Sequence, residues 1–145
     1  MSNQKQRKQP SLTVDAIVIH DDKILLIKRK NPPFRDHYAL PGGFVEYGET
    51  TENACLRELM EETGVKGEII SLVGVYSDPN RDPRGHVISI AYLCKPLSTN
   101  VKAGSDAKQA QWLPLSELDN IKLAFDHKKI VRDALNKYRD FEREI

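Results

Sequence analysis

The stretch from Gly43 to Val65, GFVEYGETTENACLRELMEETGV, constrains the fold of this chain more than any other part of it. Residues 51–63 of this stretch predict a helix, because Thr50 can cap its first turn and Gly64 can end its last turn. The apolar positions that predict its buried side are Leu56, Leu59 and Met60.

The opposite side of the predicted helix is acidic. Glu58, Glu61 and Glu62 have the spacing i, i+3 and i+4, so their side chains share one face. Three neighbouring carboxylates repel one another, and a bound hard cation that prefers oxygen ligands, chiefly Mg²⁺, would relieve that repulsion. A solvated acidic face is the alternative interpretation of these three residues taken alone.

The whole stretch resembles the signature of the Nudix hydrolases, G(x)5E(x)7REUxEExGU, in which U is bulky and apolar. The chain fills the defined places with Gly43, Glu49, Arg57, Glu58, Leu59, Glu61, Glu62, Gly64 and Val65. The resemblance implies the α/β (α+β) fold class, as a Nudix-type α/β/α sandwich with a mixed sheet. It also implies Mg²⁺-dependent cleavage of a pyrophosphate bond in a nucleoside diphosphate derivative, with Mn²⁺ as the second candidate metal.

The resemblance also implies roles for single residues. The expected metal ligands are the backbone carbonyl of Gly43 and the carboxylates of Glu58, Glu61 and Glu62. Arg57 carries a donor fork that pairs well with carboxylates, so we expect it to support catalysis by orienting Glu49 or Glu61.

The base that takes a proton from water has two candidate locations. One is Glu61 or Glu58 on the predicted helix, which we favour because these residues would already lie beside the metal. The other is Asp106, on the loop before Trp112, where relatives also place a base. Gln109 occupies a position where we would expect an acid, and an amide cannot accept the proton usefully.

Strands and a second helix surround this stretch. We interpret residues 1–10 as a flexible N-terminal arm and residues 11–145 as a single Nudix hydrolase domain. Pro41-Gly42-Gly43 is predicted to end the short strand at residues 38–40, and we expect Gly42-Gly43 and Gly48 to let the chain turn tightly around the site. A helical turn is predicted at residues 116–120 and a helix at residues 126–142. The predicted strands are Thr13–His20, Lys23–Lys30, Tyr38–Leu40, Gly67–Tyr76, His86–Lys95 and Ala110–Leu113.

Composition limits the partners of the protein. Lys plus Arg number 22 and Asp plus Glu number 21, so overall charge does not favour nucleic acid or an anionic membrane. No apolar run approaches the roughly 20 residues of a membrane span, and no secretory signal is recognisable. We therefore expect a cytoplasmic protein without nucleic-acid or membrane partners. Cys55 and Cys94 fit no metal-binding spacing and predict buried thiols.

The segments outside the helix indicate the substrate. SDPNRDPRGHVISIAYL from Ser77 and LAFDH from Leu123 are similar to the ADP-ribose pyrophosphatase branch of the family. This resemblance implies hydrolysis of ADP-ribose to AMP and ribose 5-phosphate. The candidate substrate contacts are Arg29, Arg81, Arg84 and Asp106, with Phe34, Tyr76 and His127 as weaker candidates that could equally be structural.

Two other functions remain open. The chain could hydrolyse another nucleotide, such as a nucleoside triphosphate or a dinucleoside polyphosphate. It could also be related to ADP-ribose-sensing transcription regulators, although we expect too few residues after Phe125 for a winged-helix domain. Members of the branch often pair, so we expect a homodimer.

Overall fold

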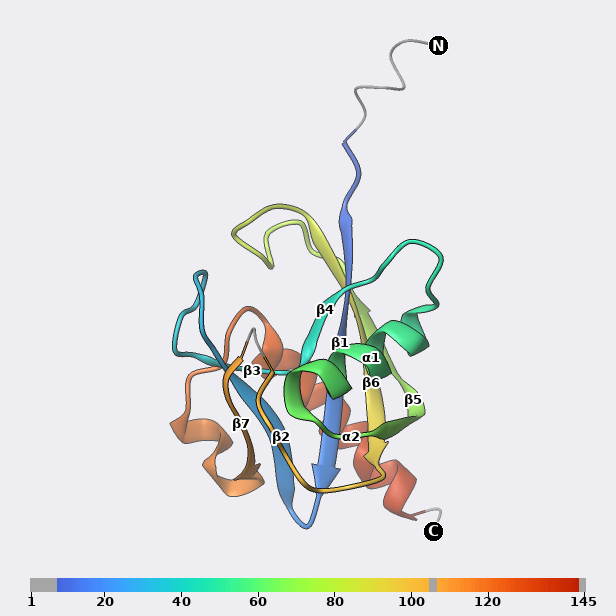
Figure 1. Ribbon diagram of the computed structural model, residues 1–145, viewed down its shortest axis with the longest axis vertical. Helices are drawn as coiled ribbons and strands as arrows, with labels where there is room; N and C mark the ends of the chain where they lie inside the picture. The colour runs from blue at the N-terminus through green and yellow to red at the C-terminus, as the bar shows by residue number, and fades with distance from the viewer. Residues whose placement is uncertain (1–7, 105–106, 144–145) are drawn as a thin grey trace.

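The computed structural model describes residues 8–104 and 107–143 of the chain. A seven-stranded sheet lies between α1 on one face and α2 on the other (Figure 1). The elements are β1 (Ser11–His20), β2 (Lys23–Arg29), β3 (Tyr38–Ala39), β4 (Gly42–Phe44), α1 (Thr51–Thr63), β5 (Gly67–Tyr76), β6 (Val87–Pro96), β7 (Ala107–Pro114), the 3-10 helix η2 (Leu115–Asn120) and α2 (His127–Arg143). The predicted α/β/α sandwich is confirmed.

The sheet is mixed, as predicted. Its main path runs β3-β2-β1-β6-β5, while β4 also pairs with β1 and β7 also pairs with β2. The β1–β6 pair is parallel, and the other pairs are antiparallel. Asp21 and Asp22 join β1 to β2 with φ values of 51° and 58°, the positive values that a tight type I′ hairpin turn requires.

Strand β1 separates two hydrophobic cores. Val14, Ala16 and Val18 pack toward α1, with Cys55 and Leu59 from that helix. Ile17 and Ile19 alternate with them and pack toward α2. Both faces of the strand are therefore covered, in keeping with the uninterrupted apolar run of residues 16–19.

Helix α1 has the predicted bounds. Thr50 Oγ1 accepts a hydrogen bond from Asn53 N at 3.1 Å, and Gly64 ends the helix with φ 73°. Leu59 is fully buried as expected, but the prediction for Met60 is wrong, since that residue is 43% exposed. The buried face instead takes in Ala54, Cys55, Glu62 and Thr63.

The predicted end of the strand before Pro41 is confirmed, because β3 ends at Ala39 and Pro41 lies in no strand, but the predicted tight turn at Gly42-Gly43 is wrong. Gly42 and Gly43 belong to β4, which pairs with residues 13–15 of β1. Of the three glycines Gly42, Gly43 and Gly48, it is Gly48, with φ 86°, that makes the predicted turn. The two glycines of β4 therefore serve a close contact between elements and not a reversal of the chain.

The remaining expectations concern the N-terminus and the cysteines. Residues 1–7 lie outside the described residues, and Lys8–Pro10 are exposed. Cys55 and Cys94 are buried free thiols, as predicted, with their Sγ atoms 3.9 Å apart. Neither helix in the described part of the chain has the length and apolarity needed to cross a membrane.

Candidate active site

Strand β4 lies directly against the acidic face of α1. Gly42 N donates a hydrogen bond of 2.7 Å to Glu62 Oε1. A Cβ atom added at Gly43 would lie 2.4 Å from Glu58 Oε2, so only glycine lets the carboxylate approach this closely. Two carboxylates of the helix are thus held against the backbone of one strand.

Substitution of the two glycines should therefore have different consequences. In Gly43→Ala the new Cβ meets only the flexible end of Glu58, so the fold should persist while kcat falls about 100-fold through misplacement of that carboxylate. In Gly42→Ala the Cβ would lie 2.1 Å from the backbone oxygen of Val14, which cannot swing away, and unfolding should become easier by about 2 kcal/mol.

Chemical denaturation and steady-state kinetics on both variants measure these two effects. If Gly43→Ala loses as much stability as Gly42→Ala, the fall in its kcat could come from unfolding, and the assignment of Gly43 to catalysis would be contradicted.

Arg57 is the centre of the ion pairs on this face. Its guanidinium donates two hydrogen bonds to Glu49, at 2.7 and 2.9 Å, and one of 2.8 Å to Glu58. It also reaches Glu61 at 3.2 Å and the backbone oxygen of Phe44 at 3.1 Å. The hydrogen bonds from Arg57 and from the Glu46 amide lower the pKa of Glu49 to about 2. Glu49 therefore stays ionised near neutral pH and fixes the arginine.

The three glutamates of the helix differ in exposure. The side chain of Glu58 is 15% exposed and Glu62 is buried, and both line a cavity. The Glu61 side chain is 58% exposed and is absent from the residues that line this cavity. Asp106, the candidate on the preceding loop of β7, lies outside the described residues.

The donor set beside β4 fits a hard cation. Among the described residues, no group of three His, Cys, Asp or Glu side chains converges on one point. A cation here would therefore be held by Glu58, Glu62 and the backbone oxygen of Gly43, with other ligands from water and substrate phosphate. Mg²⁺ is bound in this way in many sites, through one or two carboxylates and several non-protein oxygens.

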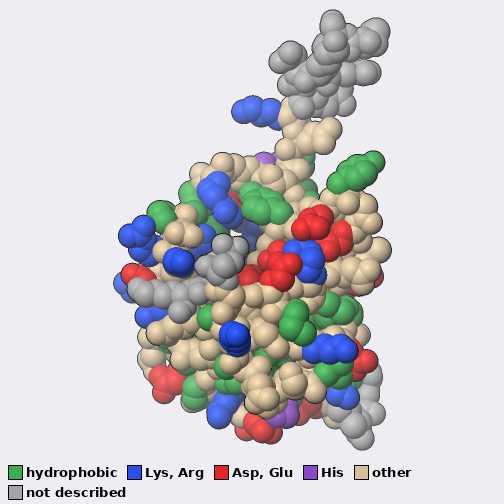
Figure 2. Space-filling view, viewed as in Figure 1, with side chains coloured by type: hydrophobic (Ala, Val, Ile, Leu, Met, Phe, Trp, Pro, Cys, Tyr) green, Lys and Arg blue, Asp and Glu red, His purple; other side chains and the backbone are tan. Residues whose placement is uncertain are grey.

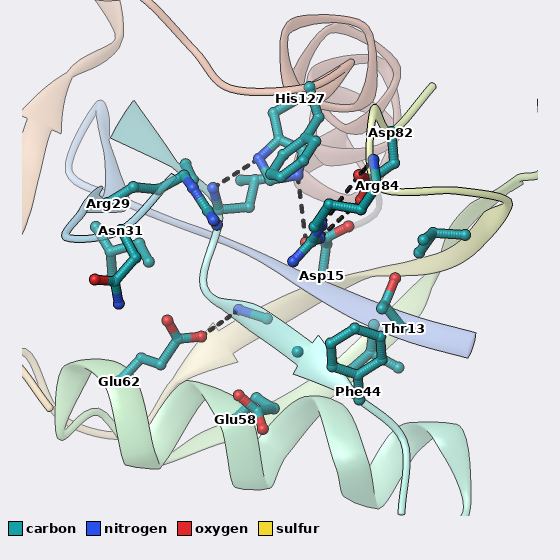
Figure 3. Close-up of a pocket in the computed structure, with 18 of the residues that line it drawn as sticks. Thr13, Asp15, Arg29, Asn31, Phe44, Glu58, Glu62, Asp82, Arg84 and His127 are labelled. Atoms are coloured by element: carbon teal, nitrogen blue, oxygen red, sulfur yellow. Dashed lines mark hydrogen bonds and ion pairs between the residues drawn. The ribbon is translucent and has the colours of Figure 1, made fainter. Parts of the chain in front are cut away.

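The cavity has a volume of about 470 Å³ and lies between β4, the start of α2 and two loops (Figure 3). Glu58 and Glu62 form its acidic wall, and Arg29 and Arg84 face them from the opposite wall. Figure 2 shows acidic side chains gathered over β4 and α1 and a separate group of basic side chains on the same side of the molecule. A ligand that spans the cavity would meet carboxylates at one wall and guanidinium groups at the other.

The predicted substrate arginines have different surroundings. Arg81 donates two hydrogen bonds to Asp126, at 2.8 and 2.6 Å, and its side chain is only 5% exposed. This geometry favours a role in holding the loop of residues 77–85 against the start of α2. Arg84 is paired with buried Asp82 but stays 44% exposed, so it is open to a ligand.

Aromatic rings complete the basic wall. The guanidinium carbons of Arg29 and Arg84 lie 5.0 and 5.3 Å from the ring centre of Phe125, and Arg84 also lies 5.9 Å from Phe44. Phe34 packs against Phe125 with a ring separation of 4.9 Å.

The weaker candidates Tyr76 and His127 have structural contacts. Tyr76 is buried and donates its hydroxyl to Asp133 at 2.7 Å. His127 Nδ1 accepts a hydrogen bond of 3.0 Å from Leu40 N, and its Nε2 lies 3.5 Å from Asp15 Oδ1. The acceptor role of Nδ1 places the proton on Nε2. His127 thus joins β1, the end of β3 and the start of α2.

The burial of His127 predicts a pH dependence of stability. Burial lowers its pKa below the ordinary value of 6.5, so the folded protein excludes a proton that the unfolded chain accepts. Stability is therefore fully present above about pH 6.5 and falls as the pH drops below it, by up to about 1.4 kcal/mol per pH unit.

The free energy of unfolding should fall less in His127→Asn than in the unaltered protein between about pH 7.5 and 5.5, by about 1 kcal/mol. The asparagine keeps an acceptor for Leu40 N. Urea denaturation at both pH values measures this fall, with His37→Asn, at a histidine that is only partly buried, as the control. The explanation fails if both variants keep the fall seen in the unaltered protein.

Several cavity residues escaped the sequence analysis. Asp15 is 7% exposed, accepts a hydrogen bond from Ser89 and lines the cavity beside His127. An acid in the middle of the apolar run TVDAIVIH was a signal that could have identified it. Phe44, at the end of β4, and Phe125, before α2, had no comparable signal, because isolated aromatic residues are common in strands and loops alike.

Both the sequence and the fold of this chain are similar to those of known proteins. The NUDIX domain model matches residues 9–134. A protein of Methanocaldococcus jannaschii named ADP-ribose pyrophosphatase is 56% identical over 126 residues, which cover 87% of this chain and 73% of the relative. A protein of Acinetobacter baylyi named ADPR responsive transcriptional repressor NtrR is 34% identical, and the match covers 86% of this chain but 53% of the relative.

Among solved structures, the NUDIX domain of Shewanella oneidensis NrtR complexed with ADP ribose is similar. It superposes with a TM-score of 0.85 at 31% identity, and the match covers 92% of each chain.

Proposed function

The chain belongs to the Nudix family, and we propose that it hydrolyses the pyrophosphate bond of ADP-ribose to AMP and ribose 5-phosphate. The observation that carries the proposal is the cavity of about 470 Å³ with Glu58 and Glu62 on one wall and arginines on the other. ADP-ribose carries its two phosphates between two riboses, so its charge would lie centrally while both ends extend along the cavity. The M. jannaschii relative, which is named ADP-ribose pyrophosphatase and is 56% identical to this chain, supports this substrate.

We assign the residues of the cavity as follows. Glu58, Glu62 and the Gly43 carbonyl would hold Mg²⁺ or Mn²⁺, which when bound neutralises phosphate charge and acidifies water. Arg57 orients Glu58 through its 2.8 Å hydrogen bond. Glu61 would then be a peripheral acid and not the principal base.

The wall opposite Glu58 and Glu62 would recognise the substrate. Arg29 would pair with oxygens of the pyrophosphate, since guanidinium groups bind phosphate through paired hydrogen bonds, and Arg84 would contact the substrate beside Phe44. Arg81 would act by positioning the loop that carries Arg84, through its pair with Asp126. Asp106 keeps its proposed role as a substrate contact.

We further propose that the protein is a cytoplasmic homodimer consisting of one domain per subunit. Leu72 and Val75 on the edge strand β5 are 46% and 57% exposed, and a partner subunit would remove these apolar side chains from water.

A substrate panel tests the proposed reaction. With Mg²⁺ present, kcat/KM for ADP-ribose should exceed that for ATP by at least about tenfold, which corresponds to about 1.4 kcal/mol of transition-state binding. Chromatography should identify AMP and ribose 5-phosphate as products, and a parallel preparation of Glu62→Gln excludes a contaminating enzyme. If ATP or a dinucleoside polyphosphate is cleaved faster, that nucleotide is the preferred substrate and the proposal for ADP-ribose is wrong.

A further inference from the structure

A second cavity adjoins the first one. Its volume is about 380 Å³, and it lies between the residues that lead into β1 and the loop that leads into β6. Ser11 N donates a hydrogen bond of 3.0 Å to His86 O, which holds these two segments together. The described residues that line it are Lys8, Gln9, Pro10, Ser11, Phe44, Arg84, Gly85, His86 and Val87.

The two cavities share a wall. Phe44, Arg84 and Val87 line both of them. Figure 3 places Phe44, Thr13 and Arg84 on one side of the first cavity, away from Arg29 and Asn31. A ligand that lies against Phe44 would therefore have one of its edges directed to the second cavity.

The second cavity favours anions. Lys8 and Arg84 contribute positive charge, and no Asp or Glu occurs among its lining residues in the described part of the chain. The Arg84 guanidinium is fixed by Asp82 at 2.7 Å while its side chain remains 44% exposed. A fixed and accessible guanidinium is well suited to phosphate.

The aromatic side of the first cavity suits a nucleobase. Phe44 is 52% exposed beside the Arg84 guanidinium, and a flat ring system could stack on both. The side with Arg29 and Asn31 is more polar and suits a sugar. This difference orients the substrate along the cavity.

We propose that the nucleoside half of the substrate lies against Phe44 and Arg84, and that the second cavity receives an additional phosphate carried by that nucleoside's ribose. The inference rests on the proposed function and extends its substrate class. Nucleoside diphosphate sugars phosphorylated on the nucleoside are then substrates, and Lys8 is a specificity-determining residue.

Kinetics on a pair of substrates test the proposal. The ratio of kcat/KM for the 2′-phosphate of ADP-ribose to that for ADP-ribose should be one or higher in the unaltered protein. Lys8→Gln should lower this ratio about fivefold, the effect of losing one exposed charge contact. Lys23→Gln, an exposed lysine at the β1–β2 turn, should leave the ratio unchanged. An unchanged ratio in Lys8→Gln overturns the proposal.

A binding measurement separates this inference from the proposed reaction. By calorimetry, adenosine 2′,5′-bisphosphate should bind more tightly than AMP to the unaltered protein. In Lys8→Gln the ratio of the Kd for AMP to the Kd for the bisphosphate should be about fivefold lower. If ADP-ribose is not cleaved, the proposed function fails, and the binding preference still decides the role of the second cavity. Equal binding of the two nucleotides would refute that role.

Discussion

Replacing Glu62 by glutamine should lower kcat for ADP-ribose by about three powers of ten, or about 4 kcal/mol of transition-state stabilisation. The reason is that Glu62 would be a charged ligand of the metal, and a neutral amide binds a hard cation poorly. The fold should be kept, because glutamine retains the oxygen that accepts the 2.7 Å hydrogen bond from Gly42 N. Steady-state kinetics and chemical denaturation measure both effects.

Removal of divalent cations should reproduce this loss in the unaltered protein. Excess chelator should abolish turnover, added Mg²⁺ should restore it, and circular dichroism should report an intact fold throughout. Glu68→Gln, which removes an exposed carboxylate from β5, is the matched control and should keep full activity. Full turnover in excess chelator would refute the assigned metal site.

Glu58→Gln should lower kcat more than 100-fold, whereas Glu61→Gln should lower it less than about tenfold, because only a positioned base or ligand contributes at that level. Glu58 lies against Gly43 in the cavity, while the Glu61 side chain is 58% exposed and touches Arg57 at 3.2 Å. Single-turnover kinetics together with Mg²⁺ titration measure the two variants and separate metal binding from the chemical step.

The opposite order would return Glu61 to the role that the sequence suggested for it. The same measurement on Asp106→Asn compares the helix with the loop before β7. If this variant is the most damaged of the three while its Mg²⁺ affinity is intact, the base belongs to that loop.

The sequence predicted the helix of the site closely, because its limits depend on local chemistry. Thr50 and Gly64 act within one turn of the helix, and their preferences outweigh the influence of the rest of the fold. Strand β4 was missed for the opposite reason. Its glycines are required by contacts with Val14 and Glu58, which are distant in the sequence, and local rules interpret such glycines as a turn.

Among the side chains of the site, too, local sequence predicted some features, while contacts between distant residues determined the others. Sequence spacing placed Glu58 and Glu62 on one face, but it could not distinguish them from Glu61, whose exposure depends on where β4 lies. Arg81 looked equivalent to Arg84 in the sequence. The pair that buries Arg81 is formed with Asp126, and no local pattern predicts that contact.

The two walls of the cavity come from different segments of the chain. Helix α1 supplies the carboxylates and also packs Cys55 and Leu59 into the core, so a change in its position would disturb folding and chemistry together. Arg29 and Arg84 come from chain segments on the other wall, at the end of β2 and before β6. Substitutions in those segments can alter which nucleotide is held while the cleavage apparatus stays fixed, so new specificities are accessible to this fold through its loops.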